Sequence, residues 1–406
     1  MRSNLIIAWR NLWRNKRRTL ITVASIFFGV LISTVMSSMQ EGSYSAMIDN
    51  IVKFYSGYIQ VHNEKYWDNK TINNTFTPSD SLEGYIQSIP EIINFAPRLE
   101  FFALASSEEI TKGSVIIGID PVRENQITEI GKWIDQGDYL HEGDDGLLVG
   151  FDLAKYLQLS VSDTLVMIGQ GYHGVSAAGK YPIRGILKFP SPELNKQTIY
   201  MDIKNCQEFF TSEGRLTSMV LMVENQYQLP KAMRQLKSRI GSPYRVMSWE
   251  EMHPDILQMI EADRDGAVIM KAILYIIIGF GIFGTIMMMI IERRREMGVM
   301  VAIGMQRHKL ATILFFETIY IGLIGVLAGF IGSVPVITYY YHNPIQLTGD
   351  AGQTYIDLGF EPFLYFSWLP SVFYNQVITV FVITAFIAIY PMITAGRLKI
   401  HLALRA

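Results

Sequence analysis

Four long apolar runs constrain this 406-residue chain more than any other feature. A helix needs about 20 predominantly apolar residues to cross a lipid bilayer. Runs of that kind occupy residues 20–41, 267–291, 311–341 and 372–396. Their only basic residue is Lys271, near one end of the second run, where a long side chain can extend to the membrane surface. We therefore predict an α-helical membrane protein with four transmembrane helices.

Residues 42–266, between the first two runs, predict a separate globular domain. Half of the chain is hydrophobic and 18% is charged, a composition that suits a mixture of membrane helices and soluble structure. Short β-type runs alternate with helical segments here, which is typical of an α+β domain. Pro and Gly near residues 120–121 and 190–192 suggest two subdomains, with one inserted at about 120–215. The β-type runs are 57–63, 113–119, 164–169, 181–187, 197–203 and 218–224, and the helical segments are 81–88, 150–158, 203–213 and 228–240.

The distribution of Lys and Arg predicts the orientation. Residues 1–19, 292–310 and 397–406 are rich in basic side chains, whereas residues 342–371 contain neither Lys nor Arg. Short cytoplasmic segments carry the excess of Lys and Arg. Both termini and residues 292–310 are therefore expected in the cytoplasm, with residues 42–266 and the 342–371 loop outside.

The N-terminal segment has two readings. A cleaved signal peptide over residues 1–39 is the alternative to a retained helix, but the basic region and the apolar run are longer than such a peptide requires. Apolar residues recur at helical spacing within residues 1–19, with arginines on the other face. This pattern predicts an amphipathic elbow helix in the membrane interface. Its apolar face is formed by Leu5, Ile6, Trp9, Leu12 and Trp13.

Patterns that would indicate catalysis or metal binding are incomplete. "GVSAAGKY" (174–181) begins like a phosphate-binding loop, but Tyr181 stands where Ser or Thr would bind Mg²⁺. "HEGDD" (141–145) lacks the second histidine of a zinc protease motif. The seven histidines are scattered, and Cys206 is the single cysteine. We expect no catalytic residue, no metal site and no bound cofactor, so this chain is predicted not to be an enzyme.

The stretch "ERRREMGVMVAIGMQRHKL" (292–310) is charged at both ends and apolar between. Each charge at a bilayer centre costs roughly 2.5–3.5 kcal/mol, so the stretch is expected outside the membrane. Met297, Val301 and Met305 follow a helical period, which predicts a cytoplasmic helix with an apolar face. Such a face needs a protein groove or the membrane surface, and the short length ending at Gly304 favours a protein partner.

Taken together, these features resemble the permeases of the FtsX/MacB superfamily of ABC transporters. Four spans, a large domain between the first two and the 292–310 stretch carry the resemblance, as do "AWRNLWRNKRRTLIT" (8–22) and "YPMITAGRLKIHLALRA" (390–406). The resemblance implies that residues 292–310 are a coupling helix that docks on a cytoplasmic ATPase. With the apolar period, it gives these docking residues: Glu292, Arg293, Arg295, Glu296, Met297, Gly298, Val301, Ala302, Gly304 and Met305.

Two stretches of the outer domain are similar to the lipoprotein-releasing (LolC/LolE-type) branch, "LLVGFDLAKYLQLSVSDTLVMIG" (147–169) and "GILKFPSPELNKQTIYMDI" (185–203). This resemblance implies a subunit of the bacterial inner membrane that extracts lipoproteins for a periplasmic carrier. ATP and Mg would be bound by a separate ATPase dimer, and a second permease, the same chain or a homologue, would complete the complex. A MacB-like drug or peptide efflux permease and an FtsX-like scaffold controlling a cell-wall hydrolase are the alternatives.

Small residues in the spans predict close helix packing. Residues Gly322, Gly325, Gly329 and Gly332 of the third span form a dimer or sliding interface, or pack within the chain. The second span has Gly279, Gly281 and Gly284, for which we expect the same packing role.

Two further features lie inside the spans. Glu317 is expected to pair with Arg397 or Arg295. Flexible and aromatic side chains suit a substrate cavity for acyl chains, although lipid-facing or core positions would explain them too. The candidate cavity residues are Phe27, Phe28, Met287 and Met288.

Overall fold

The computed structural model describes residues 2–14, 16–107, 109–224, 226–357 and 360–397. Apart from Arg397, the predicted cytoplasmic tail 397–406 lies outside the described residues. The chain divides into two compact units, which we describe separately. The helical unit comprises Met1–Ser45, Met259–Gln346 and Phe363–Ala406, and the sheet unit comprises Ala46–Gln258 and Leu347–Pro362.

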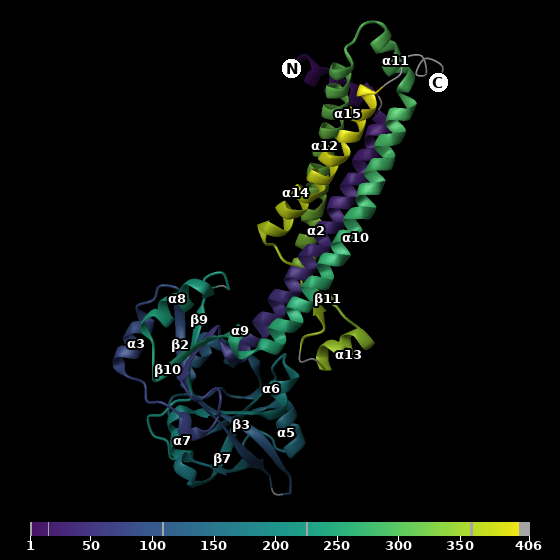
Figure 1. Cartoon of the computed structure of the whole chain (residues 1–406). Helices are drawn as coiled ribbons and strands as arrows, with labels where there is room; N and C mark the ends of the chain where they lie inside the picture. Colours follow the sequence, from purple (N-terminus) through teal and green to yellow (C-terminus); the bar gives the residue numbers. More distant parts are fainter. Residues whose placement is uncertain (1, 15, 108, 225, 358–359, 398–406) are drawn as a thin grey trace. The chain divides into compact units, whose positions relative to one another are not determined.

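The helical unit contains the four predicted apolar helices (Figure 1). Stretches long and apolar enough to cross a bilayer are Thr19–Ile51, Pro254–Glu292, Arg307–His342 and Pro370–Gly396. Each is longer than the corresponding apolar run because the helical conformation continues into polar sequence. The elements are α1 (Arg2–Arg14), α2 (Lys16–Ile51), α10 (Pro254–Glu292), α11 (Arg294–Ala302), α12 (Arg307–His342), α14 (Pro370–Ile387) and α15 (Ile389–Gly396).

Apolar side chains on the facing sides of α2, α10, α12 and α14 form the core of the helical unit. Ile26, Ile282, Ile321 and Val380 are fully buried in it. Large apolar side chains on the outward sides of the same helices are exposed, as expected for helices surrounded by lipid. Packing inside and apolar side chains outside are consistent with a membrane location.

The predicted loop 342–371 contains regular structure. Strands β11 (Ile345–Gln346) and β12 (Phe363–Leu364) pair as an antiparallel hairpin, and α13 (Asp350–Asp357) lies between them in sequence. The segment after β12 bonds to α2, because Ser38 Oγ donates to the carbonyl oxygen of Ser367 at 2.7 Å. This segment is therefore more than a connection between α12 and α14.

The sheet unit is an α+β domain. All six predicted β-type runs overlap strands, and all four predicted helical segments overlap helices. The strands are β1 (Ile59–Asn63), β2 (Ile92–Ser106), β3 (Thr111–Ile119), β4 (Ile134–Gly137), β5 (Leu147–Gly150), β6 (Thr164–Gln170), β7 (Ser176–Leu187), β8 (Thr198–Asp202), β9 (Ser218–Val223) and β10 (Tyr244–Ser248). The helices are α3 (Asp80–Gln87), α4 (Pro121–Thr128), α5 (Phe151–Leu157), α6 (Pro192–Gln197), α7 (Ile203–Phe209), α8 (Leu229–Arg239), α9 (Trp249–Met252) and α13.

One ten-stranded sheet runs through the sheet unit in the order β10-β1-β9-β2-β3-β8-β5-β7-β4, with β6 pairing with β2 and β7. Strand β3 pairs antiparallel with β2 and parallel with β8. It thereby joins the strands from both ends of the insert to those of the predicted inserted subdomain, about 120–215. That segment is not a separate sheet, because its strands extend the sheet that the flanking residues begin.

Candidate functional site

The 292–310 stretch forms a short helix with sharp ends. Arg293 has φ −95° and ψ 5°, which separates α10 from α11. At the other end Gly304 N–H donates to the carbonyl of Val301 (3.1 Å) and Met305 N–H to that of Met300 (3.0 Å). These two bonds form a Schellman cap, which requires a left-handed residue, and Gly304 has φ +105°. The role of Gly304 in this structure is thus to end α11.

A buried ion pair holds α11 to α12. Arg293 Nη1 lies 2.5 Å from Glu317 Oε1, and the two side chains are 4% and 3% exposed. Sequence reasoning expected Arg397 or Arg295 as the partner of Glu317, and this was wrong. Arg293 turns inward because the helix breaks at its position, whereas Arg295 and Arg397 remain exposed.

The elbow helix, α1, bonds to Glu317 and to a second carboxylate, that of Glu296. Asn11 Nδ2 donates to Glu317 Oε2 at 3.5 Å, and the Arg14 guanidinium pairs with Glu296. Arg293 Nε also lies 3.5 Å from Glu296 Oε2. Side chains of α1, α11 and α12 therefore meet in one polar network.

The apolar stripe of α11 faces this chain. Met297 is 1% exposed and lies in the core of the helical unit, and Val301 and Met305 pack against that core. The prediction that this stripe faces a partner groove is wrong for Met297, whose side chain is buried in the chain itself, and it stays a prediction for the half-buried Val301 and Met305. The periodicity was real, but the helices of the chain itself supply the groove.

A different set of residues is available for docking. Of the predicted docking residues, Arg293, Met297 and Gly298 are buried, and Val301 and Met305 are half-buried. Ile303, which was not among the predicted docking residues, is 81% exposed at the turn before Gly304. The signal for Ile303 in the sequence was its position directly before the glycine that was predicted to end the helix. The last residue of a helix can point away from it. The exposed predicted residues are Glu292, Arg295, Glu296, Ala302 and Gly304.

A cavity of about 600 Å³ lies beside this exposed surface. Its lining comes from α1, α11 and α12, with apolar residues such as Val299 and Ile313 and charged residues such as Arg295 and Glu296. Surfaces that combine an apolar floor with charged residues suit a protein partner.

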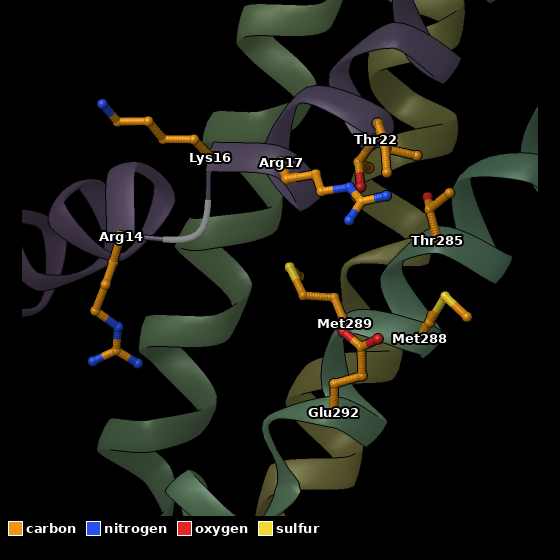
Figure 2. Close-up of a pocket in the computed structure, with 9 residues that line it drawn as sticks. Arg14, Lys16, Arg17, Thr22, Thr285, Met288, Met289 and Glu292 are labelled. Carbon is orange, nitrogen blue, oxygen red and sulfur yellow. The ribbon is translucent and has the colours of Figure 1, made fainter.

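A second cavity of about 530 Å³ lies between α2 and α10. Figure 2 shows Arg17 of α2 and Thr285 of α10 directed toward the same space. Of the four predicted cavity residues, Met288 lines it, whereas Met287 does not. Phe27 packs against Gly332, and Phe28 is exposed. The structure does not bring the four residues together in this cavity.

The glycines of α12 make contacts within the chain. A Cβ at Gly325 or Gly329 would lie 2.6 or 2.7 Å from Ile26 or Val30 of α2. Gly332 likewise meets Phe27, and Gly322 meets Thr384 of α14. In α10, by contrast, a Cβ at Gly281 or Gly284 would meet nothing within 4 Å among the described residues, so these two glycines do not pack within the chain, and the alternative of an interface with another subunit stays a prediction.

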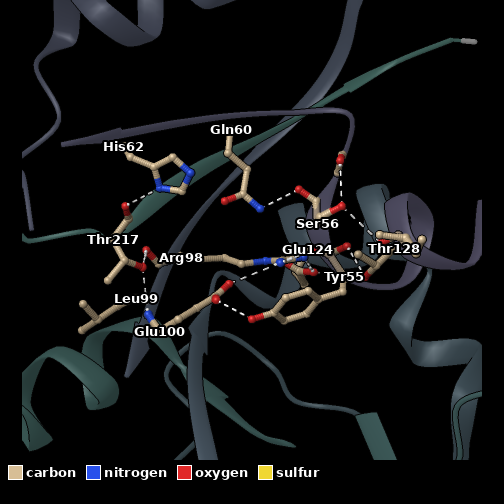
Figure 3. A network of polar contacts seen from close by, with 12 residues as sticks. Tyr55, Ser56, Gln60, His62, Arg98, Leu99, Glu100, Glu124, Thr128 and Thr217 are labelled. Carbon is tan, nitrogen blue, oxygen red and sulfur yellow. Dashed lines mark hydrogen bonds and ion pairs between the residues drawn. The ribbon is translucent and has the colours of Figure 1, made fainter. Parts of the chain in front are cut away.

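The sheet unit contains a buried polar network (Figure 3). Arg98 Nη2 and Nε bond to the two carboxylate oxygens of Glu124 at 2.6 and 2.9 Å, and Tyr55 Oη donates to Glu100 at 2.7 Å. Burial disfavours the charged guanidinium, but the carboxylates of Glu124 and Glu100 outweigh it and raise the pKa of Arg98. The network joins α4 to β2 and gives the buried charges their partners, which is a structural role.

Two acidic residues of the incomplete "HEGDD" pattern form ion pairs within the sheet unit. Asp144 of "HEGDD" accepts from Arg184 at 2.8 Å, and Glu142 lies 3.4 Å from Lys204. Cys206 is buried, which raises the pKa of its thiol. Among the described residues, no three His, Cys, Asp or Glu side chains are grouped so that they could hold a metal ion.

Two family models match this chain. The FtsX-like permease C-terminal model matches residues 268–400, and the MacB-like periplasmic core domain model matches residues 19–239.

Curated relatives are similar over most of the chain. The lipoprotein-releasing system transmembrane protein LolC of Xylella fastidiosa (strain 9a5c) is 23% identical over 332 residues, which is 78% of each chain. LolE of Haemophilus influenzae is 20% identical over 270 residues, covering 64% of this chain and 65% of LolE. An uncharacterized ABC transporter permease of Methanocaldococcus jannaschii is 20% identical and covers 80% of this chain and 82% of its own.

Two solved structures overlap part of the chain. The extracellular domain of the noncanonic ABC-type transporter YknZ is 11% identical with a TM-score of 0.33, and covers 47% of this chain and 99% of its own. The periplasmic region of MacB from Actinobacillus actinomycetemcomitans is 10% identical with a TM-score of 0.36, and covers 54% of this chain and 98% of its own.

Proposed function

The chain belongs to the FtsX/MacB superfamily of ABC transporter permeases, and we propose that it releases lipoproteins from the inner membrane. The observation that carries this proposal is the similarity to LolC over 78% of both chains. The family implies an ATPase partner and a second permease subunit. Lipoprotein as the substrate and a periplasmic carrier as the acceptor are our inference from the names of the relatives.

The exposed end of α11 supports an ATPase-docking role. Ile303 offers an apolar contact, and Arg295 and Glu296 lie on the neighbouring cavity. An exposed apolar side chain with charged neighbours is typical of an interaction site. We infer that the ATPase contacts this surface and that Met297 and Arg293 transmit the contact into the helical unit.

Movement of α11 would reach the outer domain through the long helices. Residues of α2 and of α10 belong to both compact units. A continuous helix carries displacement along its length without a change in its backbone hydrogen bonds. This supports a mechanism in which ATP-driven movement at one end changes the sheet unit, with no substrate path across the bilayer.

The proposed orientation places both termini and α11 in the cytoplasm and the sheet unit in the periplasm. Cys206 is fully buried, so the labelling reagent should not react with it. A signal therefore reports the cysteine that was added. We expect a membrane-impermeant maleimide to label Asp135→Cys in intact spheroplasts and to label Lys309→Cys only after lysis. Labelling of Lys309→Cys in intact spheroplasts would reverse the orientation.

Depletion in the native host tests the substrate. We expect lipoproteins destined for other locations to accumulate in the inner membrane, measured by membrane fractionation and mass spectrometry. Expression of the wild-type chain should restore sorting. Normal lipoprotein sorting together with increased sensitivity to exported compounds would favour efflux, the candidate that the MacB-like core domain supports.

A further inference from the structure

A cavity of about 450 Å³ in the sheet unit has no part in the proposed docking or transmission. Its lining comes from the π-helix Val52–Ser56, from β1, β2, β3 and β9, from the turn after β1 and from the end of α9. Five aromatic side chains form much of its wall: Tyr55, Tyr66, Trp67, Phe101 and Phe102. A cavity of this size, with aromatic side chains and a few polar groups in its wall, falls in the range that small ligands occupy.

Two buried polar atoms in this lining have no hydrogen-bond partner among the residues that the structure describes. They are His62 Nε2 and Ser218 Oγ, on side chains of residues that are 1% and 2% exposed. The two residues are directly opposite each other in the β1–β9 pair. Buried polar atoms normally have a partner, so two orphans side by side in one cavity indicate a bound group.

The hydrogen bonds of His62 define what that group must offer. His62 Nδ1 lies 3.2 Å from the carbonyl oxygen of Thr217 (Figure 3), and a carbonyl only accepts, so Nδ1 carries the proton. Burial lowers the pKa of His62 to about 4, which keeps the ring neutral at pH 7. Nε2 is therefore an acceptor with an unused lone pair.

The position of this acceptor is fixed. The imidazole stacks on Tyr66 with ring centroids 5.4 Å apart, and Trp67 lies at the same distance on a tilted plane. Three other polar groups of the wall have partners of their own: Tyr55 bonds to Glu100, Gln60 Nε2 donates to the carbonyl of Ser56, and Lys70 lies over the Trp67 ring at 4.0 Å. The ring of His62 cannot turn away to find another donor without losing its stacking and its bond to Thr217.

We propose that this cavity binds an aromatic group that carries an N–H donor, with the N–H directed to His62 Nε2 and the ring against the aromatic wall. Water molecules can bond to Nε2 and to the hydroxyl of Ser218, but they would leave the aromatic side chains of the wall in contact with water. The volume of the cavity also exceeds the space of one or two water molecules. The ligand is either a small aromatic molecule or a tryptophan side chain of a polypeptide, since both offer the same chemistry. The inference does not depend on the proposed transport function.

Binding of indole to the intact chain in nanodiscs tests this proposal. Isothermal titration should show saturable binding of indole and at least tenfold weaker binding of 1-methylindole, which has the same shape without the N–H. In ¹⁵N-histidine spectra, indole but not 1-methylindole should shift one Nε2 resonance. Equal binding of the two compounds, or binding of neither indole nor a Gly-Trp-Gly peptide, would overturn the proposal.

Variants identify the acceptor and the source. His62→Phe should remove the preference for indole over 1-methylindole, whereas His173→Phe, at an exposed position outside the lining, should keep it. If His62→Phe does not fold, the wild-type spectra still decide, because the shifted resonance is assigned to His62 by the tautomer with the proton on Nδ1, which the bond to the Thr217 carbonyl fixes. Stronger binding of the peptide than of indole assigns the ligand to a polypeptide, and the reverse assigns it to a small molecule.

Discussion

Arg293 and Glu317 form an ion pair in which both side chains are almost fully buried, with Nη1 and Oε1 2.5 Å apart. The pair connects the break between α10 and α11 to the N-terminal half of α12. A buried pair of this kind adds little net stability compared with apolar residues, but the loss of one partner leaves a buried charge unpaired.

Glu317→Leu should therefore destabilise the helical unit by about 3–5 kcal/mol, because it leaves the Arg293 guanidinium buried without its main partner. The double change Arg293→Met with Glu317→Leu should recover most of that loss. Thermal unfolding in nanodiscs measures both. A double variant no more stable than Glu317→Leu would show that the pair itself, rather than the unpaired charge, determines stability.

Ile303→Asp should weaken ATPase association about tenfold or more while the chain stays folded, because Ile303 is exposed and makes few contacts within its own chain. Copurification and substrate-stimulated ATP hydrolysis measure the effect. Val122→Asp is the matched control, an exposed apolar residue of the sheet unit. If Ile303→Asp kept wild-type ATP hydrolysis, the docking surface would have to lie elsewhere.

Gly329→Leu should destabilise the packing of α12 on α2 by about 1–3 kcal/mol, because a Cβ there already comes within 2.7 Å of Val30. Gly281→Ala in α10 should be neutral or stabilising by up to about 1 kcal/mol in the isolated chain, because nothing lies within 4 Å and alanine favours the helix. Thermal unfolding compares the two. A destabilising Gly281→Ala that appears only in the assembled complex would locate a second subunit at this face.

The pH dependence of the sheet unit should carry a contribution from His62. Burial lowers the pKa of His62 from 6.5 to about 4, so the unfolded chain binds a proton that the folded chain excludes. The stabilisation is complete above pH 6.5 and is lost as the pH falls toward 4, by on the order of 3 kcal/mol. Hydrogen exchange of β1 amides in the intact chain measures it, with His62→Phe as the reference that should lose this part of the pH dependence.

Bound indole should deepen that pH dependence. A ligand that donates to neutral His62 Nε2 binds the unprotonated ring, so its affinity should fall as the pH approaches 4. His253, which also lines the cavity, has its pKa lowered by burial and acts in the same direction. Titration at two pH values in the wild-type chain and in His253→Gln separates the two histidines.

Local patterns in the sequence were sufficient for the spans and for six of the ten strands described in the large sheet, since length and periodicity are local properties. Strand β2 was missed although it is the longest in the sheet, because Pro97, Arg98 and Glu100 interrupt its alternation. Burial of Arg98 depends on Glu124, which is 26 residues away, and no local pattern contains that pairing.

The side of α11 that faces a partner could not be predicted either. Periodicity identified Met297 and Val301 as one face, but it does not say whether that face meets the same chain or another one. The answer depended on where α12 returns, which is set by the Arg293–Glu317 pair and by the cap at Gly304. Exposed Ile303 is outside the period for the same reason: it belongs to the turn and not to the helix.

The bonds from the elbow helix have a consequence for the membrane itself. Asn11 and Arg14 bind the same two carboxylates, Glu317 and Glu296, that position α11. On the face of α1 away from these bonds, Trp9 and Trp13 are exposed and in contact with each other. Side chains of this kind settle at the depth of the lipid headgroups. A change in bilayer thickness or lateral pressure that displaces α1 would thus reach the carboxylates beside the proposed docking surface. If the ATPase binds there, as we propose, lipid composition would set how readily it binds.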